Sequence, residues 1–230
     1  MNRKAYLICL SIDFFTIFAP IMRNVLTTLG NVPVSSSTIL SLYPGIRSKS
    51  MKIATLEKTG EITRLKRNMF VVNPEETGLK LSMGLIANHL LSPSYVSMQT
   101  ALRHYGLIPE AVYTTQSMTF KAAKEFQTPV GNFSYLHISR EAYPIGITQI
   151  RDGKAVYIMA SPEKALCDLI ANMPGVNLRF MKEARAFLED DLRLDMEEFL
   201  SFDRTILEEY AKVGKKSTSI QTILKLLDNE

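Results

Sequence analysis

The chain is poor in the residues from which disulfide frameworks and metal centres are built. Its 230 residues include two cysteines, Cys9 and Cys167, which lie far apart in apolar stretches. Such cysteines are typical of buried thiols in a reducing compartment, not of a disulfide framework. The three histidines have no zinc-ligand spacing with either cysteine, so we predict no metal site.

Motifs for phosphate binding and nucleophilic catalysis are also missing. The sequence has no P-loop, no glycine-rich dinucleotide loop, no nucleophile elbow and no Cys/His dyad. Asp152-Gly153-Lys154 has the Asp-x-Lys spacing of a metal-dependent nuclease, and Glu141 or Glu163 is a further candidate carboxylate. Asp-Gly between two strand-like runs is also a strong hairpin signal, and we favour that interpretation. We therefore predict no catalytic residues, no enzymatic activity and no cofactor.

A long apolar run occurs only near the start of the chain, from Ala5 to Ala19. Asp13 interrupts it, and it is shorter than the ~20 apolar residues of a membrane span. Three interpretations stay open: an extra helix packed on the protein, a start codon placed too early with the true start near Met22, and a signal or anchor. We favour the last of these least. The predictions are an N-terminal extension over residues 1–20, no membrane partner and a cytoplasmic location.

Charge is distributed unevenly, although the formal net charge is only +4. Residues 43–73 hold seven Lys or Arg and two Glu, a balance of +5. Residues 183–210 hold ten acids and three Arg, a balance of −7. This separation predicts that any anion-binding surface lies near the N-terminus.

The basic segment 43–73 begins with a predicted helix over residues 49–58. Ile53 and Leu56 are three residues apart and therefore share one face of that helix. Cationic and small polar side chains are left for solvent or a ligand. Gly60 supplies a helix stop, because glycine adopts the left-handed C′ conformation without a Cβ penalty.

A cationic β-hairpin is predicted directly after this helix. Apolar or β-branched runs at residues 62–65 and 69–72 flank a polar tip, Lys66-Arg67-Asn68. A basic helix followed by a basic hairpin suits a winged helix-turn-helix, whose helix enters the major groove while the wing neutralises phosphates. An ordinary surface helix and hairpin with solvated lysines explains the same pattern.

The neighbouring patterns divide the chain into two predicted domains. Short helices over residues 21–29 and 37–42 complete a winged helix-turn-helix domain over 21–73, and a polar boundary at 74–78 opens a second domain, 74–230. The second domain is predicted to be α+β, with helices flanking a mostly antiparallel sheet. Its predicted helices are 79–91, 97–105 and 163–173, and its predicted strands are 112–120, 133–140, 146–150 and 155–160.

An ordered set of four phrases in the second domain, taken with the hairpin, resembles the AbiEi-type antitoxins. These are predicted transcriptional regulators of phage-defence loci, and the resemblance runs from residue 22 to residue 172. Two departures are Asn68, where the family wing commonly has Gly, and the apolar leader before Met22. Asn tolerates the left-handed conformation better than other non-glycine residues. The phrases are Ser92-Pro93-Ser94-Tyr95-Val96-Ser97, Ala101-Leu102 with Gly106-Leu107-Ile108-Pro109, Thr128-Pro129-Val130-Gly131, and Ala160-Ser161-Pro162-Glu163-Lys164-Ala165-Leu166-Cys167-Asp168.

This resemblance implies an antitoxin that represses its own operon. Its winged helix would bind double-stranded operator DNA, and its second domain would neutralise a nucleotidyltransferase-type toxin encoded beside it. The oligomeric state stays open, with cooperative monomers on DNA as one option. The DNA-binding candidates are Arg47, Lys49, Ser50, Lys52, Arg64, Lys66 and Arg67. The motif residues of the second domain are Tyr95, Ser97, Gly106, Gly131, Glu163, Lys164 and Asp168.

Most of these motif residues can be explained by structural roles, without a catalytic function. Ser97 is a candidate cap for the helix that follows it, and Tyr95 is expected to pack against the helix before it. A buried ion pair involving Lys164 is favoured over a catalytic role. The alternative function is a protein-interaction module whose degenerate winged helix no longer binds DNA.

Overall fold

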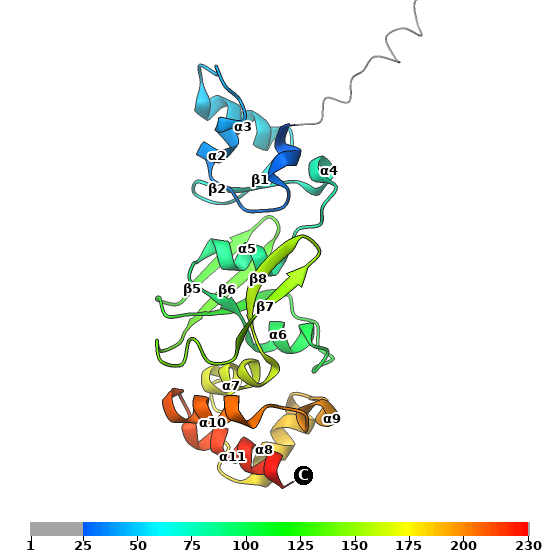
Figure 1. Cartoon of the computed structure of the whole chain (residues 1–230), viewed down its shortest axis with the longest axis vertical. Coiled ribbons are helices and arrows are strands. Elements are labelled where there is room, and N and C mark those ends of the chain that lie inside the picture. Colours follow the sequence, from blue (N-terminus) through cyan, green and yellow to red (C-terminus); the bar gives the residue numbers. More distant parts are fainter. Residues whose placement is uncertain (1–24, 230) are drawn as a thin grey trace, which may run out of the picture.

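The computed structural model describes residues 25–229, which form a mixed α+β protein with three stacked parts (Figure 1). A small helical unit with a hairpin lies at one end, a mixed sheet lies in the middle, and a layer of helices lies at the other end. The extension 1–20, residues 21–24 of the first predicted helix, and Cys9 all lie outside the described residues.

The first unit has the predicted order of helices and hairpin. Its elements are η1 (Val25–Leu29), α2 (Ser36–Ser41), α3 (Lys49–Lys58), β1 (Ile62–Lys66) and β2 (Met69–Val72). The described part of the first predicted helix is a 3₁₀-helix, whereas α3 has the predicted bounds. A small core made of Leu26, Ile39, Ile53, Leu56, Ile62, Phe70 and Val72 holds these elements together.

Local sequence explains where these elements begin and end. The Ser35 hydroxyl accepts a hydrogen bond from the Thr38 N–H and caps α2. Gly60 follows α3 with a φ of +78°, as predicted for the helix stop. Asn68 has a φ of +59° and so adopts the left-handed conformation that the hairpin tip requires. An isolated bridge between Val34 and Phe70 adds a third short extended segment to the hairpin.

The middle sheet has the strand order β5-β6-β4-β3-β8-β7. Three of its five strand pairings are antiparallel, in agreement with the predicted mostly antiparallel sheet, but the sheet is mixed, because β3 pairs parallel with β8 and β4 pairs parallel with β6. The strands are β3 (Tyr95–Val96), β4 (Thr114–Thr119), β5 (Lys124–Thr128), β6 (Gly131–His137), β7 (Ile147–Asp152) and β8 (Ala155–Ala160).

Two strands that the sequence did not reveal produce the parallel pairs. β3 has only two residues, and β5 is a polar, largely exposed edge strand, so neither has a clear apolar alternation. Because β5 and β6 form a hairpin with β5 at the edge, β6 lies next to β4 and runs in the same direction. Asp152 ends β7, and a turn at Gly153 and Lys154 joins it to β8, so the predicted antiparallel hairpin is confirmed.

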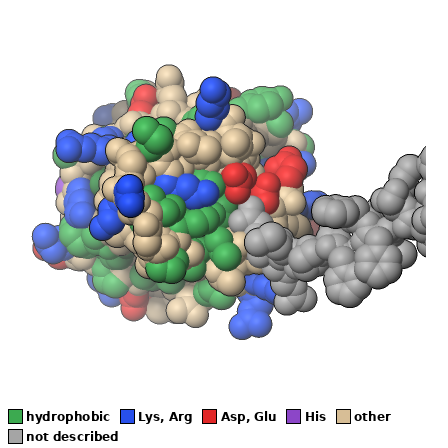
Figure 2. All heavy atoms as spheres, turned by 90° about the horizontal axis from the view of Figure 1, so that it is seen from above, with side chains coloured by type: hydrophobic (Ala, Val, Ile, Leu, Met, Phe, Trp, Pro, Cys, Tyr) green, Lys and Arg blue, Asp and Glu red, His purple; other side chains and the backbone are tan. Residues whose placement is uncertain are grey.

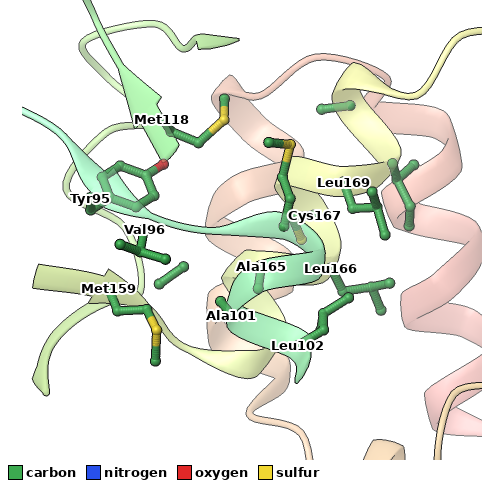
Figure 3. Close-up of a cluster of buried hydrophobic side chains, with 14 of the residues drawn as sticks. Tyr95, Val96, Ala101, Leu102, Met118, Met159, Ala165, Leu166, Cys167 and Leu169 are labelled. Atoms are coloured by element: carbon green, nitrogen blue, oxygen red, sulfur yellow. The ribbon is translucent and has the colours of Figure 1, made fainter. Parts of the chain in front are cut away.

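Helices cover both faces of the sheet. On one face lies α5 (Met83–Leu90), whose Ala87 carbonyl accepts a hydrogen bond from the Tyr135 hydroxyl. On the other face lie α6 (Met98–His104) and α7 (Pro162–Asn172). Figure 3 shows Ala101 and Leu102 of α6 beside Ala165 and Leu166 of α7. Cys167 of α7 is a free, buried thiol, as predicted.

The remaining helices form a layer beyond α7. They are α8 (Met181–Ala186), the π-helix η2 (Phe187–Asp191), α9 (Met196–Phe199), α10 (Arg204–Val213) and α11 (Ser217–Asp228). One continuous core runs from the sheet through α7 into α10 and α11. No helix between residues 25 and 229 combines the length and the apolar character that crossing a bilayer would require.

The hairpin β1–β2 contributes to two cores at once. Phe70 and Val72 belong to the small core of the first unit, whereas Leu65 and Val71 belong to the large core beneath it. The hairpin therefore lies between the helices of the first unit and the sheet, and α4 (Pro74–Thr77) makes the covalent connection. This placement positions the basic side chains of the hairpin tip.

Candidate functional site

Helix α3 presents a broad exposed face. Ile53 and Leu56 are buried in the small core and fix the orientation of the helix. Met51 is 68% exposed, and the short side chains of Ala54 and Thr55 are exposed beside it. The predicted residues Arg47, Lys49 and Ser50 are exposed at the N-terminal end, and Lys58 is exposed in the last turn.

Lys52 lies on the flank of α3. Its ammonium lies 4.1 Å from the centroid of the Tyr43 ring, a cation–π arrangement that holds the side chain against the loop before the helix. Lys52 does not line the hollow beside the helix, unlike Lys49 and Ser50. The latter two line an open hollow of about 370 Å³ between α2, α3 and the hairpin, together with Ser36, Leu40, Ile53, Ala54, Arg64, Asn68 and Phe70.

Arg64 of the hairpin has a partner within the unit. Its guanidinium donates two hydrogen bonds to the Glu57 carboxylate, at 2.8 and 2.5 Å, and its Cζ lies 4.7 Å from the centroid of the Phe70 ring. The hydrogen bond from Arg64 to Glu57 raises the pKa of the guanidinium. We predicted that Arg64 contacts a DNA phosphate. Its bidentate pair with Glu57 already compensates much of the positive charge of the guanidinium.

The hairpin tip is attached to its neighbours at two points. The Lys66 ammonium donates to the Leu90 carbonyl at the end of α5, at 2.6 Å. The Asn68 side-chain oxygen accepts from the N–H of Ser36 at 3.1 Å. Arg67, between them, is exposed. Arg64 and Arg67 therefore both reach solvent, but Arg64 is held by Glu57.

Figure 2 shows the end of the molecule that carries the first unit. Lys and Arg side chains surround an apolar centre, and they are densest on the left of the view. Acidic side chains appear near the centre beside a basic one. The surface is basic overall, but it is not uniformly positive.

A second constellation, around Asp168, is buried. The Asp168 carboxylate accepts hydrogen bonds from the hydroxyls of Tyr95 at 2.9 Å, Ser97 at 2.7 Å and Tyr210 at 3.1 Å. Its Oδ1 also lies 3.4 Å from the Lys164 Nζ, and both side chains are 0% exposed. The structure thus brings together four of the predicted motif residues and adds Tyr210.

Burial dominates the protonation equilibria of this cluster. Removal from water raises the pKa of Asp168, although Lys164 and the three hydroxyls act in the opposite direction. Burial lowers the pKa of Lys164, against the attraction of Asp168. The Lys164 ammonium also donates to the Ala142 carbonyl at 2.7 Å and lies 4.3 Å from the centroid of the Tyr210 ring. These contacts confirm the buried ion pair that we predicted for Lys164.

The other predicted motif residues have architectural positions. Ser97 precedes α6 but makes no side-chain cap, because its hydroxyl donates to Asp168, so the capping prediction is wrong. Glu163 accepts a hydrogen bond from the Asp203 N–H at 3.0 Å and does not join Asp168. Gly106 ends α6 with a φ of +78°, and Gly131 forms the β5–β6 turn.

Sequence reasoning missed two sets of residues. Tyr210 joins Asp168 across 42 positions of sequence, and one tyrosine in an amphipathic helix gives no signal for such a contact. The second set lies on the exposed face of α3. None of its members was among the predicted DNA-binding residues: Met51, Ala54, Thr55 and Lys58. Since Ile53 and Leu56 define the buried side, helical geometry places these four on the exposed side.

Two of the carboxylates considered for a nuclease site have other places in the fold. Asp152 is the last residue of β7, next to the β7–β8 turn, and Glu163 accepts a hydrogen bond from the Asp203 N–H. The described residues contain no group of three or more His, Cys, Asp or Glu placed to hold a metal ion.

Comparison with known protein families gives no matching family model, and comparison with curated proteins gives no match either.

Proposed function

We propose that the protein binds double-stranded DNA through the first unit, which we interpret as a winged helix with α3 as its recognition helix. Three helical segments followed by a hairpin, with a bridge from Val34 to Phe70, support this interpretation. The charge balance of +5 over residues 43–73 supports attraction to phosphates.

The exposed face of α3 carries the proposal. Ile53 and Leu56 are fixed in the small core, while Ser50, Ala54 and Thr55 place short side chains on the exposed face, next to the longer Met51. Short side chains allow a helix to approach base edges closely, and Arg47 and Lys49 at its N-terminal end would contact phosphates. Arg67 would add a phosphate contact from the hairpin tip, and Arg64 and Lys66 would contribute less because they have partners within the chain.

We infer further that the protein is a cytoplasmic antitoxin that represses its own operon. This step rests on the resemblance of the motif phrases to the AbiEi-type antitoxins. The partner would be a nucleotidyltransferase-type toxin encoded beside it. The acidic α9 and its surroundings offer a complementary surface for a basic toxin cleft, since Asp190, Asp191, Glu197 and Glu198 are exposed there.

Titration with the DNA upstream of its own gene tests DNA binding. Fluorescence anisotropy should show binding that weakens with salt, and Arg47→Ala with Lys49→Ala should lower the slope of log K against log[salt] by about 1.8, at about 0.9 per phosphate contact. The matched control is Lys182→Ala with Lys212→Ala, which removes two exposed cations from the C-terminal layer. A folded wild-type protein that ignores this DNA at low salt would refute the proposal.

One observation favours a second candidate, a protein-interaction module that does not bind DNA. The hairpin is enclosed between two cores, and Arg64 and Lys66 are engaged internally. The same titration separates the candidates, because a pure interaction module would show neither binding nor a salt slope.

A further inference from the structure

Three lysines from two distant segments of the sequence lie near one another where the hairpin tip contacts the sheet. Lys66 ends β1, Lys121 precedes β5, and Lys124 begins β5. The ammonium groups of Lys66 and Lys124 lie 5.8 and 4.8 Å from the centroid of the same ring, that of Phe126. Lys121 donates a hydrogen bond to the Ser92 carbonyl, close to the Leu90 carbonyl that holds Lys66.

Among residues 25–229, no carboxylate pairs with Lys66 at this junction. Glu125 follows Lys124 directly in the sequence, but its strand register pairs it with Ser134, on the opposite face of the sheet from Lys124 and Phe126. Burial lowers the pKa of Lys66, and the charges of Lys124 and Lys121 lower it further. Carbonyl oxygens satisfy hydrogen bonds but carry no net charge, so the cluster keeps a positive potential.

The cluster is continuous with the proposed DNA-binding face. Arg67 follows Lys66 directly, and Asn68 lines the hollow that also contains Lys49 and Ser50. Figure 1 places β2 and β5 on the same side of the molecule, and Figure 2 shows Lys and Arg gathered on that side. A duplex resting on α3 therefore has a basic path towards the sheet.

We propose that Lys121 and Lys124 bind backbone phosphates of the duplex held by α3 and that Lys66, held by the Leu90 carbonyl, adds its positive charge to theirs; these three are the junction lysines. The DNA footprint then extends beyond the first unit onto the sheet. This inference rests on the proposed function and adds Lys121 and Lys124, which lie outside the winged-helix segment. The contacts carry no base specificity, because phosphates are the same in every sequence.

The test is anisotropy titration of the full chain with duplexes of two lengths. Lys121→Gln with Lys124→Gln removes both charges but keeps long side chains over Phe126. On a duplex of about three helical turns the salt slope should fall by about 1.8, whereas on one of about 10 base pairs, a single turn, it should change little. Lys182→Gln with Lys212→Gln is the matched control and should change neither slope.

The outcomes separate this inference from the proposed function. If wild type binds, Arg47→Ala with Lys49→Ala weakens binding, and the junction variant behaves as the control on both duplexes, the inference is wrong and the proposed function stands. If folded wild type binds no duplex, both fail. An equal loss on single-stranded DNA would overturn the assignment to duplex. Circular dichroism and thermal unfolding verify that each variant is folded.

Discussion

Side chains from three separate parts of the fold contact the Asp168 carboxylate. Tyr95 and Ser97 come from the central strand β3 and the residue after it, Lys164 comes one turn earlier on α7, and Tyr210 comes from α10. One carboxylate thereby joins the sheet to the C-terminal helices. A buried charge with fewer partners would destabilise the fold, since removing one member of a buried ion pair costs about 3 to 5 kcal/mol.

Asp168→Asn should destabilise the protein, and the loss should depend on pH. Burial raises the pKa of Asp168, so the native state holds this proton more tightly than the unfolded chain does. The associated stability is fully present below the pKa of the unfolded chain and is lost as pH rises through the native pKa. The difference in unfolding free energy between wild type and variant should therefore shrink with rising pH, by at most about 1.4 kcal/mol per pH unit.

Urea unfolding between pH 4 and pH 8 measures this difference. Asp191→Asn, at an exposed position, is the control and should show a small, flat difference. A difference that grows with pH would contradict the prediction, because it would mean that Lys164 and the hydroxyls outweigh burial and hold the pKa of Asp168 down.

At the scale of residues, the sequence predicted those features that depend on helical periodicity or on the conformational preference of a single residue. A buried ion pair involving Lys164 was predicted without a named partner, and the partner is Asp168, four residues later on the same helix. The left-handed Asn68 followed from the tolerance of that residue for the conformation. Tyr210 and the Glu57 partner of Arg64 depend on tertiary packing, which no local pattern encodes.

At the scale of helices and strands, close packing can determine the residue type at a position where helix propensity favours a different residue. Gly84 lies in the first turn of α5, where alanine would favour the helix by up to about 1 kcal/mol. A Cβ at this position would lie 2.3 Å from Cε2 of the Tyr157 ring. The glycine thus lets α5 approach β8 closely.

Gly84→Ala should consequently destabilise the protein by about 1 to 3 kcal/mol through overpacking. In a Tyr157→Leu background the same change should be neutral or stabilising, because the ring is gone and only the helix propensity remains. Chemical unfolding followed by circular dichroism measures both effects. Stabilisation by Gly84→Ala in the wild-type background would show that α5 moves freely away from the sheet.

The limits of sequence prediction are also clearest among the elements. Helix α3, the hairpin and β7–β8 were found because apolar spacing and turn residues agree there. The helix predicted over 79–91 begins only at Met83, and the two-residue β3 was missed. The position of the hairpin between two cores was also missed, since Leu65 and Val71 give the same pattern on any amphipathic hairpin.

The whole molecule places its basic and acidic regions at opposite ends. The first unit, with the basic face of α3, lies at one end of the long axis, and the acidic helical layer lies at the other. The hairpin shared between two cores and the Asp168 cluster connect the three parts. Two partners could therefore be bound at once without competing for one surface.

We expect the two proposed activities to be separable by mutation. Arg47→Ala with Lys49→Ala should lose promoter binding but still relieve growth arrest by the toxin encoded in the neighbouring reading frame. Glu197→Lys with Glu198→Lys should retain promoter binding but slow association with the toxin by about tenfold or more, because charge steering is reversed. Glu75→Lys with Glu141→Lys, exposed acids outside that layer, is the matched control. Unchanged toxin neutralisation by the Glu197 and Glu198 variant would exclude α9 as the docking surface, and loss of both activities in either folded variant would contradict their separation.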